Sequence, residues 1–247
     1  MRTIYFYLCL IINLIGTDFK KIKYNSIKKH KTKEEIDAYL AKVVTDWSNF
    51  VLKIGGLNLT VIGKENIPCE PCLFVGNHQS NFDIPVILSN MNRLTGAIAK
   101  KEMEKIPVMS YWMRQIHSVF MDRENPREAL KSISEGVENL KNGYSMIIFP
   151  EGTRSRSNNM GEFKKGSMRL AIKAGVPIVP ITFYDTHKAM EGNNGKVKKA
   201  NAKLIIDKPI YMDKMSKEEK AGISEMVQNI IQANLNVENE KKERSSS

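Results

Sequence analysis

Residues 73–87, LFVGNHQSNFDIPVI, change from a strand pattern to a helix pattern across a short polar segment. An apolar run of strand type is followed by a polar HQSN segment, and a helix is predicted to begin near Asp83 with Pro85 in its first turn. His78 and Asp83 are five residues apart, and on a regular helix such residues point about 140° away from each other. The two side chains can therefore meet only if the chain turns between them.

The same alternation of short β-rich runs and helices continues from about residue 57, which predicts an α/β domain over residues 57–236. Asn125 and Pro126 begin a predicted helix that ends at Gly143, and Ser216 with Glu219 opens the last helix. Residues 237–247, VENEKKERSSS, are charged and are predicted to be a disordered tail. The predicted strands are LNLTVI (57–62), PCLFVGN (71–77), RLTGAIAK (93–100), HSVFMD (117–122), YSMIIFP (144–150), VPIVPITFY (176–184) and AKLIIDKPI (202–210).

The composition is that of a globular protein with an anionic partner. The chain has 247 residues, of which 42% are hydrophobic, so it can bury a substantial core. Its 38 Lys and Arg against 27 Asp and Glu give a formal charge of +11, which favours nucleic acid, anionic lipid or a phosphorylated substrate. Three cysteines cannot form a disulfide framework, and the CEPC pair lacks the further ligands of a zinc site, so no metal site is predicted.

The N-terminal residues 1–56 are predicted to form two helices. Residues 3–16 are apolar, but as a helix they are only about 21 Å long, short of the roughly 30 Å of a bilayer core. A Lys-rich linker follows, and Thr32 with Glu35 forms a capping box for an amphipathic helix that ends at Gly55 and Gly56. This pattern fits a segment on the membrane surface about as well as a helical hairpin packed on the α/β domain.

The spacing of His78 and Asp83 allows general-base chemistry. An ionised aspartate that accepts from one ring nitrogen fixes the histidine tautomer and leaves the other nitrogen free to take a proton from a hydroxyl. On these two residues alone, the alternative is stronger: Asp83 caps the helix and His78 is an ordinary loop residue. The chain contains no G-x-S-x-G sequence, so a nucleophile activated by such a base would belong to the substrate.

Basic residues follow several predicted strands. Arg154 lies in the turn after the predicted strand 144–150, Arg123 lies between a strand and a helix N-terminus, and Lys101 follows a third strand. Ligand sites of α/β sheets gather at the carboxyl ends of strands, so these cations are predicted to form one pocket beside His78.

Four blocks in a fixed order resemble the glycerolipid acyltransferase family. They are NHQSNFD (77–83), HSVFMDR (117–123), FPEGTR (149–154) and VPIVP (176–180), and FKKG (163–166) also resembles the family pattern. The resemblance covers roughly residues 57–210, and the ordered set is far more specific than any one block. It implies a mixed sheet flanked by helices, with the N-terminal two-helix segment against the membrane.

The resemblance also implies an activity. A fatty acyl group would move from a thioester of acyl carrier protein or coenzyme A to the 2-hydroxyl of lysophosphatidate, giving phosphatidic acid, with no cofactor or metal. His78 would be the base, Asp83 would orient it, Arg123 and Arg154 would hold the phosphate, and the enzyme would be anchored at the cytoplasmic face of an anionic membrane. The substrate-binding candidates are Arg123, Glu151, Gly152, Thr153, Arg154, Lys101 and Lys165.

One position departs from the family pattern, because His117 stands where the second block usually has glycine. The departure bears on the local backbone path and on acceptor selectivity, and a structural role is expected for this side chain. The alternatives are an acyltransferase for another lysolipid, a hydrolase with the same base, and a basic nucleic-acid-binding protein. The last is disfavoured because no nucleic-acid motif occurs and the lysines gather near the apolar N-terminus.

Overall fold

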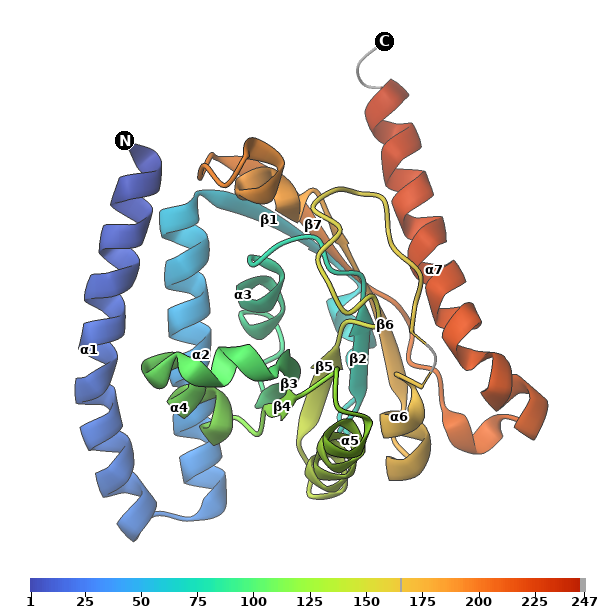
Figure 1. The fold of residues 1–247 in the computed structure, drawn as a ribbon, viewed down its shortest axis with the longest axis horizontal. Helices are drawn as coiled ribbons and strands as arrows, with labels where there is room; N and C mark the ends of the chain where they lie inside the picture. The colour runs from blue at the N-terminus through green and yellow to red at the C-terminus, as the bar shows by residue number, and fades with distance from the viewer. Residues whose placement is uncertain (165, 245–247) are drawn as a thin grey trace.

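The protein forms a seven-stranded sheet with helices on both faces, and the structure, a computed structural model, describes residues 1–164 and 166–244 (Figure 1). The fourteen main elements, with five short 3₁₀ turns between them, are α1 (Arg2–His30), α2 (Lys33–Gly55), β1 (Leu57–Ile62), β2 (Leu73–Gly76), α3 (Asp83–Leu88), β3 (Thr95–Lys100), α4 (Pro107–Gln115), β4 (Val119–Met121), α5 (Pro126–Lys141), β5 (Ser145–Ile148), α6 (Arg169–Ala174), β6 (Ile178–Tyr184), β7 (Ala200–Ile206) and α7 (Lys217–Arg244).

The sheet is mixed, with strand order β1-β7-β6-β2-β5-β3-β4. Strands β6, β2, β5, β3 and β4 are parallel, β7 is antiparallel to β6, and β1 is parallel to β7. All seven predicted strands are present, and the predicted mixed α/β class is confirmed. Because five neighbouring strands share a direction, their carboxyl ends lie along one edge of the sheet, where the loops that follow them come together.

The central strands are buried on both faces. On β2, Phe74 packs into the apolar cluster that includes α2 and α3, whereas Leu73 and Val75 pack into the cluster that includes α5, α6 and α7. All four residues of β2 are buried, which agrees with the near-continuous apolar runs of parallel strands. The sheet therefore provides a rigid support for the loops at its carboxyl edge.

The N-terminal helices form a hairpin that packs on the α/β domain. The predicted capping box is confirmed: the Thr32 hydroxyl accepts from the Glu35 backbone, and the Glu35 carboxylate accepts from the Thr32 backbone. The end of α2 presses so closely on the residue before Asp83 that a Cβ at Gly55 would lie 2.4 Å from the Phe82 ring. The end of α2 therefore packs directly on the α/β domain, against Phe82 and α3.

The Lys-rich linker between the two helices was predicted wrongly, because α1 continues through it to His30. Lysine is a good helix former, and the basic Lys28, Lys29 and His30 in the last turn suit the negative end of the helix dipole. With 29 residues, α1 is long and apolar enough to cross a membrane by length and composition, contrary to the estimate from residues 3–16. Its large exposed apolar side chains are Ile4, Tyr5, Tyr7, Leu8, Ile11, Ile12, Ile15, Phe19 and Ile22.

The C-terminal segment also differs from its prediction. Ser216 and Glu219 form the expected capping box, but α7 continues through Arg244, so a disordered tail is wrong for residues 237–244. Glu238 is buried and its carboxylate pairs with Lys203 and Lys241, which gives the charged helix end specific partners. The remaining predicted tail, residues 245–247, lies outside the described residues.

His117, which stands where the family pattern has glycine, has a backbone conformation that favours glycine. Its φ is 60°, in the left-handed region that glycine adopts without strain. The imidazole stacks on the Tyr144 ring with centroids 3.6 Å apart, and burial lowers the pKa of His117. The side chain packs between elements of the fold, as the predicted structural role requires.

Candidate active site

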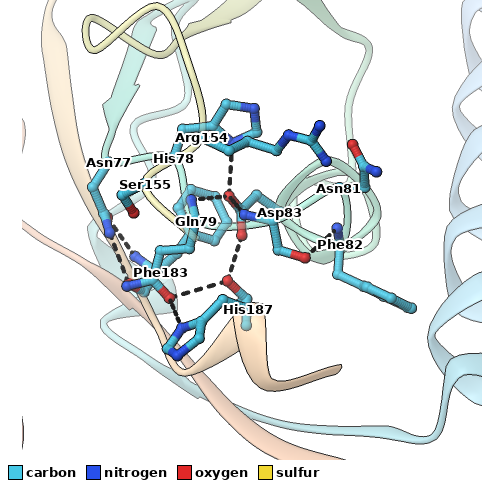
Figure 2. A network of polar contacts seen from close by, with 12 residues as sticks. Asn77, His78, Gln79, Asn81, Phe82, Asp83, Arg154, Ser155, Phe183 and His187 are labelled. Atoms are coloured by element: carbon cyan, nitrogen blue, oxygen red, sulfur yellow. Dashed lines mark hydrogen bonds and ion pairs between the residues drawn. The ribbon is translucent and has the colours of Figure 1, made fainter. Parts of the chain in front are cut away.

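The HQSN turn is attached to the sheet through Asn77, the residue before it. Asn77 follows β2, and its side-chain amide donates to the Phe183 carbonyl at 2.9 Å and accepts from the Phe183 N–H at 2.8 Å. Asn77 thus continues the pairing of β2 with β6 through its side chain, and the backbone is free to turn away from the sheet. The turn then brings His78 and Asp83 to the same side (Figure 2).

His78 and Asp83 meet as predicted. The ring Nδ1 lies 2.8 Å from Asp83 Oδ2, and the same oxygen accepts from the backbone N–H groups of Gln79 at 2.7 Å and Ser80 at 2.9 Å (Figure 2). The second oxygen, Oδ1, accepts from the Thr186 hydroxyl at 2.6 Å. Asp83 is fully buried, so these four donors offset the cost of removing its carboxylate from water.

The His78 ring is held with one nitrogen available to a ligand. The imidazole stacks on Phe149, with ring centroids 4.1 Å apart and an interplanar angle of 18°, and 19% of the side chain is exposed. Asp83 occupies Nδ1, and within the described residues no group hydrogen-bonds Nε2. When Nδ1 carries the proton, Nε2 presents a lone pair, which is the arrangement of a general base.

Glu151 hydrogen-bonds the backbone of His78. Its Oε1 accepts from the His78 backbone N–H at 2.6 Å, and its Oε2 accepts from the Gly161 N–H at 2.8 Å. Burial raises the pKa of Glu151, while the two backbone N–H groups act in the opposite direction. Both carboxylate oxygens bind the protein backbone and the side chain is buried, so Glu151 holds the backbone of His78 to that of Gly161.

Arg154 is joined to the same turn by an acidic residue that the sequence did not indicate. Its guanidinium donates to Glu191 at 2.8 Å, and the buried Glu191 carboxylate also accepts from the Asn81 N–H at 2.9 Å and the Ser80 hydroxyl at 2.6 Å. The Arg154 side chain remains 31% exposed. The arginine of the FPEGTR block is therefore held at a fixed place relative to His78.

Two further basic side chains, those of Arg123 and Lys164, lie close to Gly152. The Arg123 guanidinium donates to the Gly152 carbonyl, and a Cβ at Gly152 would lie 3.0 Å from both Arg123 Nη1 and Lys164 Nζ. Gly152 has φ 74°, so a residue without a side chain suits both the turn and the close approach of the cations. Two cations beside a bare backbone form a site suited to a phosphate.

The remaining substrate-binding candidates are Thr153, Lys165 and Lys101. Thr153 is exposed in the turn after β5, and Lys165 lies outside the described residues. Lys101 pairs with Asp122 at 3.2 Å and lines a polar hollow with Glu104 and Arg114. The structure thus brings Glu151, Gly152 and Arg123 together and directs Lys101 to an acidic partner.

Comparison with known proteins agrees with this geometry. Residues 58–184 match a protein-family model described as acyltransferase. The chain belongs to the acyltransferase family. It is 40% identical over 155 residues to a chloroplastic 1-acyl-sn-glycerol-3-phosphate acyltransferase of Brassica napus, covering 62% of this chain and 45% of that protein. The match with an Arabidopsis thaliana relative covers 48% of its length, so this acyltransferase chain spans about half of these plant relatives.

Two further comparisons extend over nearly the whole acyltransferase chain. A probable 1-acyl-sn-glycerol-3-phosphate acyltransferase of Mycoplasma genitalium is 29% identical over 240 residues, covering 92% of this chain and 86% of the relative. The crystal structure of the 1-acyl-sn-glycerophosphate acyltransferase PlsC from Thermotoga maritima superposes with a TM-score of 0.85 at 28% identity, covering 96% of this chain and 95% of that one. The fold, including the N-terminal hairpin, is therefore one that a solved acyltransferase shares.

Three supporting residues of the acyltransferase site were missed from the sequence. Lys164 stood next to the chosen Lys165 in FKKG, and Thr186 follows the predicted strand 176–184, so the rule that sites gather at strand ends could have indicated both. Glu191 carried no signal of this kind.

Proposed function

We propose that the protein is a 1-acylglycerol-3-phosphate O-acyltransferase, which moves a fatty acyl group from a thioester to the 2-hydroxyl of lysophosphatidate. The observation that carries the proposal is the His78–Asp83 pair, whose Nε2 no described residue hydrogen-bonds, joined through Glu151 to the turn at Gly152 where Arg123 and Lys164 meet. The names of the relatives in Brassica napus and Mycoplasma genitalium support the choice of acceptor. The product would be phosphatidic acid.

In the proposed reaction, His78 Nε2 takes the proton of the 2-hydroxyl as that oxygen attacks the thioester carbonyl carbon. The tetrahedral intermediate collapses, the C–S bond breaks, and the leaving thiolate takes the proton from the imidazolium. The products are an ester and a free thiol, and His78 returns to its neutral form without a covalent acyl-enzyme. General-base help of this kind is typically worth about 10²–10⁴-fold in rate.

The basic groups would hold the acceptor's phosphate. Arg123 and Lys164 approach each other over Gly152, and Arg154 adds a guanidinium fixed by Glu191. A bound phosphate fixes the glycerol backbone, so the 2-hydroxyl is presented to Nε2 in one orientation. The acyl donor would be a thioester of acyl carrier protein or of coenzyme A.

The N-terminal hairpin would place the enzyme on the cytoplasmic face of an anionic membrane. The exposed apolar side chains of α1 give it an unburied face, and the chain has a formal charge of +11. Apolar side chains in the acyl region and lysines at the headgroups stabilise such a position together. An acceptor could then enter from the bilayer while the thioester arrives from the cytosol.

Mass spectrometry of products from a panel of donors and acceptors tests the proposal. The donors are palmitoyl and oleoyl thioesters of acyl carrier protein and of coenzyme A, and the acceptors are lysophosphatidate, lysophosphatidylglycerol and monoacylglycerol. We expect phosphatidic acid as the main product, formed only when lysophosphatidate is present. Release of free fatty acid at the same rate without an acceptor would indicate a hydrolase, and a preference for lysophosphatidylglycerol would assign another lysolipid.

A further inference from the structure

The oxygen of Asp83 that does not face His78 has its own dedicated donor. Thr186 donates its hydroxyl to Asp83 Oδ1 at 2.6 Å, and the two residues are 103 positions apart in the sequence. Thr186 is fully buried and begins the short 3₁₀ turn η3 (Thr186–Ala189) that follows β6. It lies beyond residues 58–184, which match the family model, and outside each of the sequence blocks that carry the family resemblance.

A carboxylate can rotate about its last side-chain bond, and Thr186 opposes that rotation. Oδ2 carries the contact to His78, whereas the donor on Oδ1 comes from a different strand end. Contacts on both oxygens fix the plane of the carboxylate, and with it the direction in which the His78 Nδ1–H must point. Without the hydroxyl, Oδ1 would be a buried acceptor with a lost partner, and the carboxylate would gain from turning toward another donor.

Thr186 also belongs to a network of polar side chains from both segments. Gln79 Oε1 lies 3.2 Å from the Thr186 hydroxyl, and the Gln79 amide donates to Asn158 at 2.9 Å. Asn158 in turn accepts from the backbone of Asp185 at 3.1 Å and donates to its carboxylate at 2.8 Å. Asp185 has φ 61°, so the chain turns sharply just before Thr186. These contacts join the HQSN turn to the residues that follow β6, and the shorter of the two contacts of the Thr186 hydroxyl is the one to Asp83 Oδ1.

We infer that Thr186 is a positioning residue for the reaction: through Asp83 it keeps the proton of neutral His78 on Nδ1 and the lone pair on Nε2. The inference rests on the proposed function only in the base role of His78, and it holds for any acceptor hydroxyl. Thr186 acts on His78 through the Asp83 carboxylate, which accepts from the Thr186 hydroxyl at one oxygen and contacts the His78 ring at the other.

The test compares Thr186→Val, which keeps the shape and removes the hydroxyl, with Thr186→Ser, which keeps the hydroxyl. Thr182→Val is the matched control, because Thr182 is equally buried on β6 and its hydroxyl contacts Asn234 instead of the His–Asp pair. The measurements are kcat and KM for acyl transfer, the melting temperature, and the ¹⁵N chemical shifts of His78, which distinguish the two ring tautomers.

We expect Thr186→Val to lower kcat about 10–100-fold with KM nearly unchanged, as is typical when an orienting partner is lost. The His78 signals should show a mixture of tautomers in this variant and the Nδ1–H form in the native protein. Thr186→Ser should restore both, and Thr182→Val should leave both unchanged whatever it does to the melting temperature.

Native kcat and a native tautomer in Thr186→Val would overturn the inference, as would a loss that Thr186→Ser fails to restore. Failure of the proposed function has a different signature, because the native protein would then transfer no acyl group to any acceptor. The tautomer measurement would still decide whether Thr186 orients the pair.

Discussion

Glu151→Gln should separate two roles for the acidic residue of the FPEGTR block. In the native protein one carboxylate oxygen accepts from the His78 N–H and the other accepts from the Gly161 N–H. A glutamine has one acceptor oxygen, so its amide group must face one of these two donors. The substitution keeps the size of the side chain and disturbs the support under His78.

The magnitude follows from the two contacts. Losing a hydrogen bond to a charged acceptor costs about 1.5–3 kcal/mol, and leaving a buried N–H without a partner costs about 1–3 kcal/mol. Removing a buried charge offsets part of this, because burial raises the pKa of Glu151 and so disfavours its ionised form. A net cost of about 2–3 kcal/mol, expressed as displacement of His78 in the transition state, lowers kcat by about 30–150-fold.

Steady-state kinetics with varied lysophosphatidate provides the measurement, and circular dichroism checks that the variant is folded. Glu162→Gln is the control, because Glu162 lies in the same loop and is exposed. If Glu151 supports His78, kcat falls and KM changes by less than about threefold. A raised KM with native kcat would refute this reasoning and would return Glu151 to the acceptor pocket.

His78→Ala should abolish acyl transfer, and native turnover in this variant would reject the assignment of His78 as the base. Arg123→Ala should raise the KM for lysophosphatidate by about tenfold or more, because a charged contact is lost, and equal losses with monoacylglycerol would contradict a phosphate role. Ile12→Asp, at a side chain that is 68% exposed, should weaken cosedimentation with anionic vesicles, whereas Ile172→Asp on α6 should not. Burial lowers the pKa of His117 in the folded protein. The contribution of its neutral form to stability is therefore present above about pH 6.5 and is lost as the pH falls through the folded pKa. The free energy of unfolding should drop more between about pH 7.5 and 5.5 in the native protein than in His117→Asn.

Local signals predicted much of this fold. Asn125 accepts from the backbone N–H groups of Arg127 and Glu128, as its position before a helix indicated, and both capping boxes formed as expected. Two of the wrong predictions, a linker before Thr32 and disorder over residues 237–244, came from treating dense charge as a break in structure. Lysine and glutamate favour helices when a buried stripe such as Leu235 and Glu238 is present to pack.

The polar partners of the site could not be predicted in the same way. Asp83 and Thr186 are 103 residues apart, and Asn81 and Glu191 are 110 apart, so no sequence spacing relates them. What brings them together is the placement of β6 beside β2, and the order of strands in a sheet is not encoded in the pattern of any one strand. The His78–Asp83 pair was predictable because one turn contains both residues.

The place of β1 in the sheet has a consequence for how the chain folds. β1 is the first strand in the sequence and lies at an edge of the sheet. Its hydrogen-bonded neighbour is β7, the last strand, and Leu57 pairs with Ala200. During synthesis the first strand must therefore wait for more than half of the polypeptide to emerge before it acquires a partner. Pairing of such distant segments is entropically costly and slow. We expect amide protons of β1 to gain protection from hydrogen exchange late in refolding, after those of the β2–β5 pair, and a nascent chain that stops before residue 200 to remain a target for chaperones and proteases.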